Sequence, residues 1–190
     1  MERLLFLPII LGTTRRGRRT EYVARFVFEQ TKKRTDVETE LIDVCKLPLK
    51  LDDAGEQIKD PTFSATIARC DGLIIVTPEY NHSYPGLLKH ALDTNLEEYI
   101  HKAVGICGVS AGGFGGVRAI EALLPVMREL GLVTIFWDVN FGNVQRLFDD
   151  QGNLLEQSYV RRVDKFLNEL VWMARVLRYG RENIPEVKTE

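Results

Sequence analysis

Cysteine is scarce in this sequence of 190 residues, and long apolar runs and an excess of one charge are absent. The three cysteines, Cys45, Cys70 and Cys107, share no metal-like spacing, and their odd number argues against a disulfide framework and fits a reducing compartment. We expect Cys107, which lies in an apolar run, to be a buried small hydrophobe. No apolar run approaches the roughly 20 residues that a membrane-spanning helix needs. These absences predict a cytoplasmic protein with no metal site and no membrane contact.

The charge balance excludes a second group of partners. The 25 lysines and arginines nearly match the 27 aspartates and glutamates, and the net charge is −2. Such a chain has no general attraction for nucleic acid, so a local cluster of residues must hold any phosphate ligand. With 45% hydrophobic residues, a chain of this length folds around a sizeable core as one domain. We expect that domain to span residues 1–180 and a frayed tail to follow over residues 181–190.

Five apolar segments with a preference for β-structure alternate with segments of helical periodicity. The third and fourth barely alternate polar with apolar residues, which is typical of strands covered on both faces in a parallel sheet. The alternation favours an α/β fold with a doubly wound, five-stranded parallel sheet in the order 2-1-3-4-5 and helices on both faces. The strands are expected over residues 4–11, 37–44, 72–77, 103–109 and 132–139.

Helices are expected where apolar residues recur at helical spacing. These segments cover residues 20–33, 61–69, 116–130 and 157–179, and Pro85 can begin a further helix. In an open sheet of this kind, ligands bind outside the carboxyl ends of the strands where the strand order reverses. That rule nominates the segments after the first, third and fourth strands as the functional site.

The segment after the first strand, residues 12–20, has the composition of an anion site. It joins two glycines, three threonines and four arginines directly before a helix, so backbone N–H groups and side chains can meet an anion there. A phosphate monoester suits this set better than a pyrophosphate, because the Rossmann and Walker glycine patterns are absent. We expect Arg15 and Arg18 to contact the anion, and one or both of Arg16 and Arg19 to face water. The alternative is a solvated basic loop in which a threonine caps the helix.

The segments after the third and fourth strands suit a planar ring. Residues 77–86 combine two prolines, which stiffen the loop, with the flat side chains of Tyr80, His82 and Tyr84. Residues 110–116 hold four glycines, which permit close approach of the backbone to a ligand. An ordinary turn and a flexible linker are the respective alternatives.

These motifs resemble those of the NADPH-dependent FMN reductase family, which includes quinone, chromate and azo-dye reductases. The family pattern G-S-x-R-x-x-S is similar to Gly12, Thr13 and Arg15, with the hydroxyl of Thr20 slightly further on. The pattern P-E-Y-N-x-S-x-P-G-x-L-K-x-A-x-D is met almost letter for letter over residues 78–93. The glycine-rich segment is similar to the family's loop after the fourth strand.

The resemblance implies a flavodoxin-like fold that binds FMN. It places the FMN phosphate near four residues of the first loop and the isoalloxazine ring near seven residues of the other two loops. The phosphate residues are Thr13, Arg15, Arg18 and Thr20, and the ring residues are Pro78, Glu79, Tyr80, Asn81, Ser110, Gly112 and Gly113.

The resemblance also implies an enzyme that moves electrons from NADPH or NADH to a small acceptor, such as a flavin, a quinone, an azo compound or a metal oxyanion. We expect no catalytic side chain, because the flavin carries the chemistry. A homodimer or homotetramer is expected. Two alternatives stay open, a flavodoxin-like electron carrier and a non-catalytic flavin-binding module. The near-neutral charge and the arginines of the first loop argue against the carrier.

Overall fold

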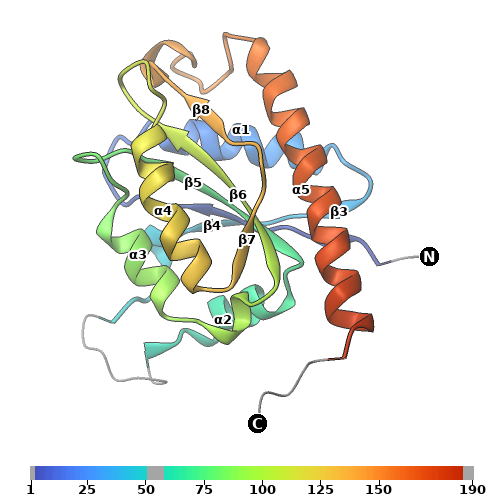
Figure 1. Ribbon diagram of the computed structural model, residues 1–190. Coiled ribbons are helices and arrows are strands. Elements are labelled where there is room, and N and C mark those ends of the chain that lie inside the picture. The colour runs from blue at the N-terminus through green and yellow to red at the C-terminus, as the bar shows by residue number, and fades with distance from the viewer. Residues whose placement is uncertain (1–2, 51–57, 186–190) are drawn as a thin grey trace.

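The computed structural model describes residues 3–50 and 58–185, and its centre is a twisted parallel sheet (Figure 1). The central strands β5 and β6 are continuous, whereas each of the other predicted strands is divided into two short pieces. The strands are β1 (Leu5–Phe6), β2 (Ile9–Leu11), β3 (Val37–Glu38), β4 (Leu41–Asp43), β5 (Gly72–Pro78), β6 (Lys102–Val109), β7 (Leu132–Thr134) and β8 (Val139–Phe141).

The strand order confirms the predicted doubly wound topology. The main sheet runs β4-β2-β5-β6-β7, β8 also pairs with β6, and β1 pairs with β3, all in parallel. When the divided strands are joined, the order is 2-1-3-4-5, as the sequence predicts. The first strand is interrupted at Pro8, which has no N–H to donate, although its carbonyl still accepts from the Ile74 N–H at 2.9 Å.

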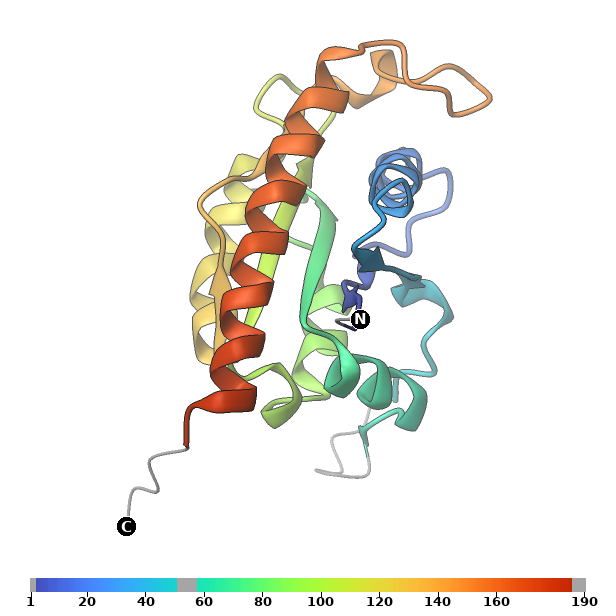
Figure 2. The same ribbon diagram turned by 90° about the vertical axis from the view of Figure 1, so that its right-hand side faces the viewer.

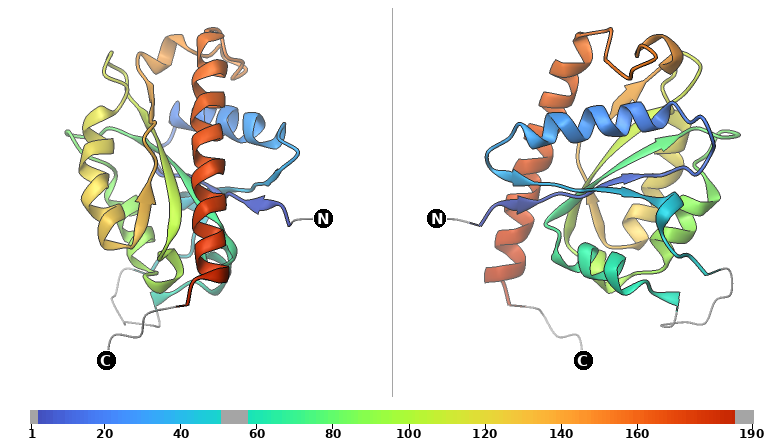
Figure 3. Two further views of the ribbon diagram at one scale, coloured as in Figure 1. Left: turned by 45° about the vertical axis from the view of Figure 1, so that its right-hand side comes forward. Right: turned by 180° about the vertical axis from the view of Figure 1, so that it is seen from behind.

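Helices cover both faces of the sheet, again as predicted. Helices α1 (Thr20–Lys32) and α5 (Ser158–Asn183) pack on one face. Figure 3 shows them from two sides, and Figure 2 shows how far α5 extends along the sheet. The opposite face carries α2 (Pro61–Arg69), α3 (Gly86–Asp93) and α4 (Val117–Glu129).

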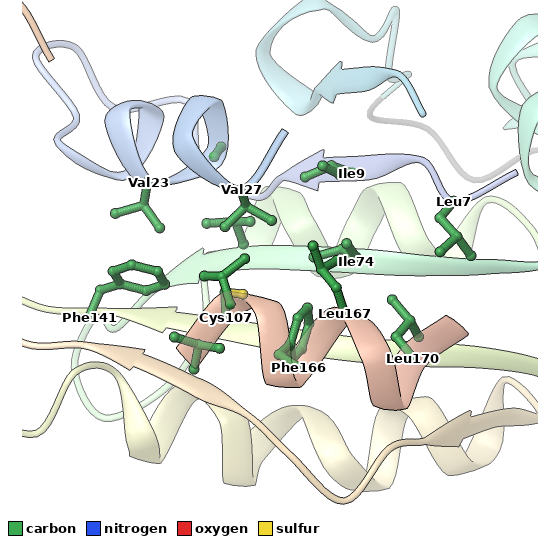
Figure 4. Close-up of a cluster of buried hydrophobic side chains, with 14 of the residues drawn as sticks. Leu7, Ile9, Val23, Val27, Ile74, Cys107, Phe141, Phe166, Leu167 and Leu170 are labelled. Atoms are coloured by element: carbon green, nitrogen blue, oxygen red, sulfur yellow. The ribbon is translucent and has the colours of Figure 1, made fainter. Parts of the chain in front are cut away.

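Alternate residues of the central strands supply the two cores. Ile74 points to the core under α1 and α5, and its neighbour Ile75 points to the core under the other three helices. Figure 4 shows Val23 and Val27 of α1 pointing into the core that also contains Phe141 and Ile74. Cys107 is fully buried in this first core, and burial raises the pKa of its thiol, so it is a small hydrophobe as predicted.

Local signals explain where the helices begin and end. The Asp60 carboxylate accepts from the Phe63 N–H at 2.7 Å and Pro61 occupies the first turn, so α2 starts where the sequence predicts. Helix α5 continues to Asn183, beyond the helix end expected at residue 179 and into the expected tail. Arg181 holds this last turn, because it donates to the His101 carbonyl at 2.6 Å. Residues 186–190 of the expected tail lie outside the described residues.

Charged side chains close the amino-terminal edge of the sheet. The Asp71 carboxylate, 1% exposed, lies directly before β5 and pairs with Arg3 at 2.8 Å, Arg181 at 3.3 Å and Arg178 at 3.7 Å. It also accepts from the Phe6 N–H at 3.0 Å. This cluster therefore joins the N-terminal strand, the central sheet and the end of α5.

Candidate functional site

The loops after β2, β5 and β6 meet at the carboxyl edge of the sheet (Figure 1), where the topology places a ligand site. The loops are connected to one another. The Thr13 hydroxyl in the first loop lies 2.9 Å from the Tyr80 hydroxyl in the second, and the Glu79 N–H donates to the carbonyl of Val109, where the third begins, at 2.9 Å. The predicted residues of all three loops thus belong to one connected edge.

The first loop begins in a tightly packed place and then opens to solvent. A Cβ at Gly12 would lie 2.8 Å from the Leu88 side chain and 3.2 Å from the Val76 carbonyl oxygen, so only glycine fits beside β5. Thr13 is buried, and the Arg15 side chain reaches over the Tyr80 ring, with 5.8 Å between guanidinium carbon and ring centroid. Thr20 is buried at the start of α1.

The four arginines of this loop have different environments. Arg15 and Arg16 are exposed, and no carboxylate pairs with Arg15 within residues 3–50 and 58–185. Arg19 lies above the Tyr22 ring and 3.7 Å from the Asp150 carboxylate. Of the two expected to face water, Arg16 does so fully and Arg19 in part.

Arg18, the second predicted phosphate residue, is engaged with protein groups. Its guanidinium makes a two-pronged contact with the Asp43 carboxylate, donates to the Thr13 carbonyl, and lies 3.4 Å from Glu21. Burial disfavours its charge, but the hydrogen bond and the charge of Asp43 outweigh this and raise the pKa of the guanidinium. Sequence reasoning missed Asp43, because the second strand was not among the three whose ends were nominated.

The second loop is a tight hairpin. Tyr80 and Ser83 exchange backbone hydrogen bonds of 2.8 and 3.0 Å, and the two residues between them have positive φ angles, 49° at Asn81 and 64° at His82. Such a turn favours asparagine at its first central position. The geometry holds Tyr80 and Asn81 at the rim of the loop, and His82 lies exposed at its tip.

Glu79 faces the first turn of α4. Its carboxylate accepts from the Arg118 backbone N–H at 3.2 Å and pairs with the Arg118 side chain at 3.0 Å. A carboxylate is stabilised at a helix N-terminus, where backbone N–H groups lack partners. Glu79 therefore joins the second loop to α4.

The glycine-rich loop has a tight part and an open part. Gly116 has a φ of +81°, and a Cβ there would lie 2.5 Å from the Val109 nitrogen. At Gly112, by contrast, a Cβ would meet no described heavy atom within 4 Å beyond its chain neighbours, and at Gly113 it would meet only Asn143 Nδ2 at 4.0 Å. The Gly112 carbonyl is bound by the Ser110 hydroxyl at 2.7 Å. The loop therefore presents a fixed stretch of backbone with free space beside it.

Two cavities adjoin this edge. The first, about 620 Å³, lies between the first loop, the hairpin and the start of α3. The second, about 600 Å³, lies around the arginines of the first loop and the start of α1. Both volumes suit a small ligand. Thr14 and Arg15 line both cavities, while Thr13, Glu79, Tyr80, Asn81, Pro85, Gly86 and Leu87 line the first only, and Arg16, Gly17, Arg18, Arg19, Glu21, Tyr22 and Cys45 line the second only.

Comparison with known proteins decides the class of ligand. Residues 7–145 match the family model described as NADPH-dependent FMN reductase. The chain belongs to this family. The match begins just before β2 and ends in the turn after β8, so it contains all three loops of the carboxyl edge. It confirms the predicted family and the predicted class, an oxidoreductase that uses FMN and a nicotinamide donor.

Individual relatives carry related names. An NADPH azoreductase of Bacillus sp. (strain OY1-2) is 33% identical over 122 residues, which are 62% of this chain and 65%, just under two thirds, of that protein. A quinone reductase of Pseudomonas putida is 27% identical over 167 residues, 83% of this chain and 89% of that protein. Among solved structures, the flavoenzyme FerB from Paracoccus denitrificans matches with a TM-score of 0.76 at 20% identity, covering 91% of this chain and 98% of that one. This last likeness supports the flavodoxin-like fold.

The residues present at the carboxyl edge fit FMN. Arg15 and the start of α1 offer positive charge to a phosphate, and the open space beside Gly112 and Gly113 leaves room for a ring. Over residues 3–50 and 58–185, no helix is both long and apolar enough to cross a membrane, and no group of three or more histidine, cysteine, aspartate or glutamate side chains could hold a metal ion.

Proposed function

We propose that this member of the FMN reductase family oxidises NADPH or NADH and passes the electrons through FMN to a small acceptor. The observation that carries the proposal is the cavity between Arg15 and the Tyr80 hairpin, in a chain that matches the family over residues 7–145. The names of the relatives support a quinone or an azo compound as acceptor. A flavin or a metal oxyanion would use the same site.

In this proposal the FMN phosphate lies against the first loop. Arg15 supplies a positive charge that no described carboxylate neutralises, and the buried Thr13 and Thr20 bring the backbone around the phosphate. The isoalloxazine ring lies against the backbone of two loops. Its neighbours are Pro78, Glu79, Tyr80, Asn81, Ser110, Gly112 and Gly113.

FMN, when bound, would supply the redox chemistry, which is the transfer of electrons from the nicotinamide to the acceptor. The side chains of this chain bind and orient the reactants. The Tyr80 hydroxyl is hydrogen-bonded to Thr13 and the Glu79 carboxylate is paired with Arg118, so both side chains hold the loops of the site together. In this proposal, backbone N–H groups of the glycine-rich loop would stabilise negative charge on a bound ring.

The test is a flavin titration followed by an activity assay. We expect the purified protein to be yellow or to take up FMN, and to oxidise NADPH or NADH directly when a quinone or an azo dye is present. A colourless protein that fails to bind added FMN contradicts the proposal. Flavin binding without direct NADPH or NADH oxidation would instead favour the electron carrier or the non-catalytic module.

We further propose one domain that assembles as a homodimer or homotetramer in the cytoplasm, without nucleic acid. Exposed aromatic side chains on α5 and beside it, Trp172, Tyr179 and Phe136, support assembly, and three free cysteines support a reducing compartment. Light scattering of the pure protein tests the assembly, and a mass equal to one chain would contradict it.

A further inference from the structure

The basic loop contains an arginine that does not behave like its neighbours. The Arg18 side chain is 11% exposed and the Asp43 side chain 14%, whereas Arg15 and Arg16 extend into solvent. The Arg18 backbone lies just before α1, and its guanidinium reaches back to the start of the loop. There it contacts both oxygens of Asp43 and the Thr13 carbonyl. It thus connects the two ends of the segment that would surround a phosphate.

Asp43 is a fixed anchor for this arginine. It is the last residue of β4 and lies opposite Leu11, the last residue of β2, in the parallel register. Its Oδ1 also accepts from the Cys45 N–H at 3.0 Å, which orients the carboxylate. Arg18 is therefore attached to the sheet itself, at the level where the loop leaves it.

The contact with the Thr13 carbonyl has a consequence for the next peptide group. In a trans peptide the carbonyl and the following N–H point in opposite directions. Because the Thr13 carbonyl faces Arg18, the Thr14 N–H has to point away from Arg18. Thr14 lines both cavities of the site, so the contact determines on which side of the loop this donor is available.

Charge also separates Arg18 from Arg15. The guanidinium of Arg18 faces two carboxylates, Asp43 in hydrogen-bond contact and Glu21 at 3.4 Å, so it adds little net positive charge to the loop. Arg15 faces no carboxylate in the described part of the chain and lines both cavities.

We propose that Arg18 is a positioning residue, which, locked onto Asp43, sets the shape of the phosphate loop while Arg15 supplies the charge that attracts the phosphate. The inference rests on the proposed function, because it assumes that FMN is the phosphate ligand. It also assigns a role in flavin binding to Asp43, an acidic residue that would repel a phosphate if it acted alone.

The sign of the effect of Asp43→Asn separates positioning from direct contact. If Arg18 binds the phosphate, Asp43→Asn removes a competing carboxylate, and FMN affinity stays constant or rises. If Arg18 positions the loop, Asp43→Asn weakens FMN binding. We expect Asp43→Asn and Arg18→Gln each to lower FMN affinity about tenfold or more. Because the two residues act through one contact, the double variant should bind FMN no more weakly than the weaker-binding single variant.

Riboflavin, which lacks the phosphate, is the matched ligand. We expect its affinity to change little in the same variants, so that the ratio of FMN to riboflavin affinity falls. Arg18→Lys keeps the charge but not the two-pronged geometry, and we expect it to fail to restore the ratio. Asp150→Asn, which removes the carboxylate beside Arg19, is the control and should leave the ratio unchanged.

Each variant is purified, its flavin is removed, and fluorescence titration with added FMN or riboflavin gives these affinities. A thermal melt of the same variant reports folding. An unchanged or higher FMN to riboflavin ratio in Asp43→Asn, or full rescue by Arg18→Lys, overturns the inference and leaves the proposed function intact. A wild-type protein that binds neither flavin overturns both. If Asp43→Asn does not fold, the FMN to riboflavin affinity ratio of Arg18→Lys is the test: a low ratio supports the inference and a wild-type ratio overturns it.

Discussion

The arginines at the amino edge of the sheet and Arg15 at its carboxyl edge have opposite environments. At the amino edge, three arginines surround the single buried carboxylate of Asp71. At the carboxyl edge, Arg15 has no carboxylate partner in the described residues, and free space lies beside Gly112. The first edge is complete without a ligand, whereas the second presents charge and backbone that a ligand would complete. The contrast shows that an edge offers a ligand site when its charges lack protein partners, whatever the number of those charges.

The directions of the strands and helices explain why the two edges of the sheet differ. Because all strands are parallel, the N-termini of α1, α3 and α4 follow the carboxyl ends of β2, β5 and β6 and bring their unpaired N–H groups to that edge. The amino edge carries instead the C-terminal end of α2, where backbone carbonyls lack partners within the helix. Lys102 donates there to the Ile67 and Ala68 carbonyls at 2.6 and 2.7 Å, so the end of α2 is satisfied by protein.

The largest expected effect comes from breaking the amino edge. Asp71→Ala leaves three arginines without their common carboxylate, and we expect it to lower the free energy of unfolding by about 3–5 kcal/mol. Urea denaturation measures the loss. FMN affinity of the folded variant should be unchanged, because the site lies at the other edge.

Glu38→Ala is the matched control for Asp71→Ala. Glu38 pairs with Arg69 at 3.2 Å, but both side chains are about half exposed, at 55% and 51%, so its removal should cost less than about 1 kcal/mol. Equal losses in the two variants would contradict the structural role given to the amino edge.

The glycine-rich loop offers a second pair of variants. Gly116→Ala places a Cβ 2.5 Å from the Val109 nitrogen at a φ of +81°. We expect it to lower stability by about 1–3 kcal/mol, the range for local backbone strain. Gly112→Ala meets open space, so it should keep its stability and lose FMN affinity. Thermal melts and flavin titration measure both, and unchanged FMN affinity in Gly112→Ala would place the ring elsewhere.

Arg15→Ala tests the charge at the carboxyl edge. We expect FMN binding to weaken by about 2 kcal/mol, roughly 30-fold, because a charge-assisted partner of the phosphate is lost. Stability should not change, since the side chain is exposed. Arg16→Ala, an equally exposed neighbour, should have a smaller effect in the same titration. The comparison between the edges fails if the two variants bind FMN equally.

The smallest effect is expected at Asp138, between β7 and β8. Asp138 reaches solvent, but the protein packed around its carboxylate and the nearby Glu121 carboxylate raise its pKa to about 6, from an ordinary value of 3.8. The folded protein therefore disfavours the charged form, and this penalty is absent below pH 3.8 and grows until the pH has passed 6. Asp138→Asn should raise the melting temperature at pH 7.5 but not at pH 3.5, and only slightly, because the residue is exposed. An equal gain at both pH values would show that the carboxyl does not titrate in this way.

The sequence predicts the fold well because the period of its apolar residues changes cleanly between strands and helices. The start of α2 follows from Asp60 and Pro61, which are local signals. The end of α5 was predicted too early, because Arg181 and Asp71, which secure it, lie far apart in the sequence.

For the candidate site, the sequence predicts the three loops but not all the contacts between their side chains. The topological rule and the family motif both lead to the residues around Arg15 and Tyr80. The partner of Arg18 is 25 positions away, and no spacing rule connects them. The orientation of Glu79 likewise depends on Arg118, which only the folded chain brings near.

The divided fifth strand has a consequence for the behaviour of the protein at high concentration. β7 and β8 form one outer edge of the main sheet and β4 the other, and each is three residues long. Between β7 and β8, Phe136 and Trp137 turn out to solvent, so no long row of unpaired backbone groups is presented to a neighbouring molecule. Interrupted edges of this kind oppose the addition of further strands, and therefore the growth of β-aggregates from the native state.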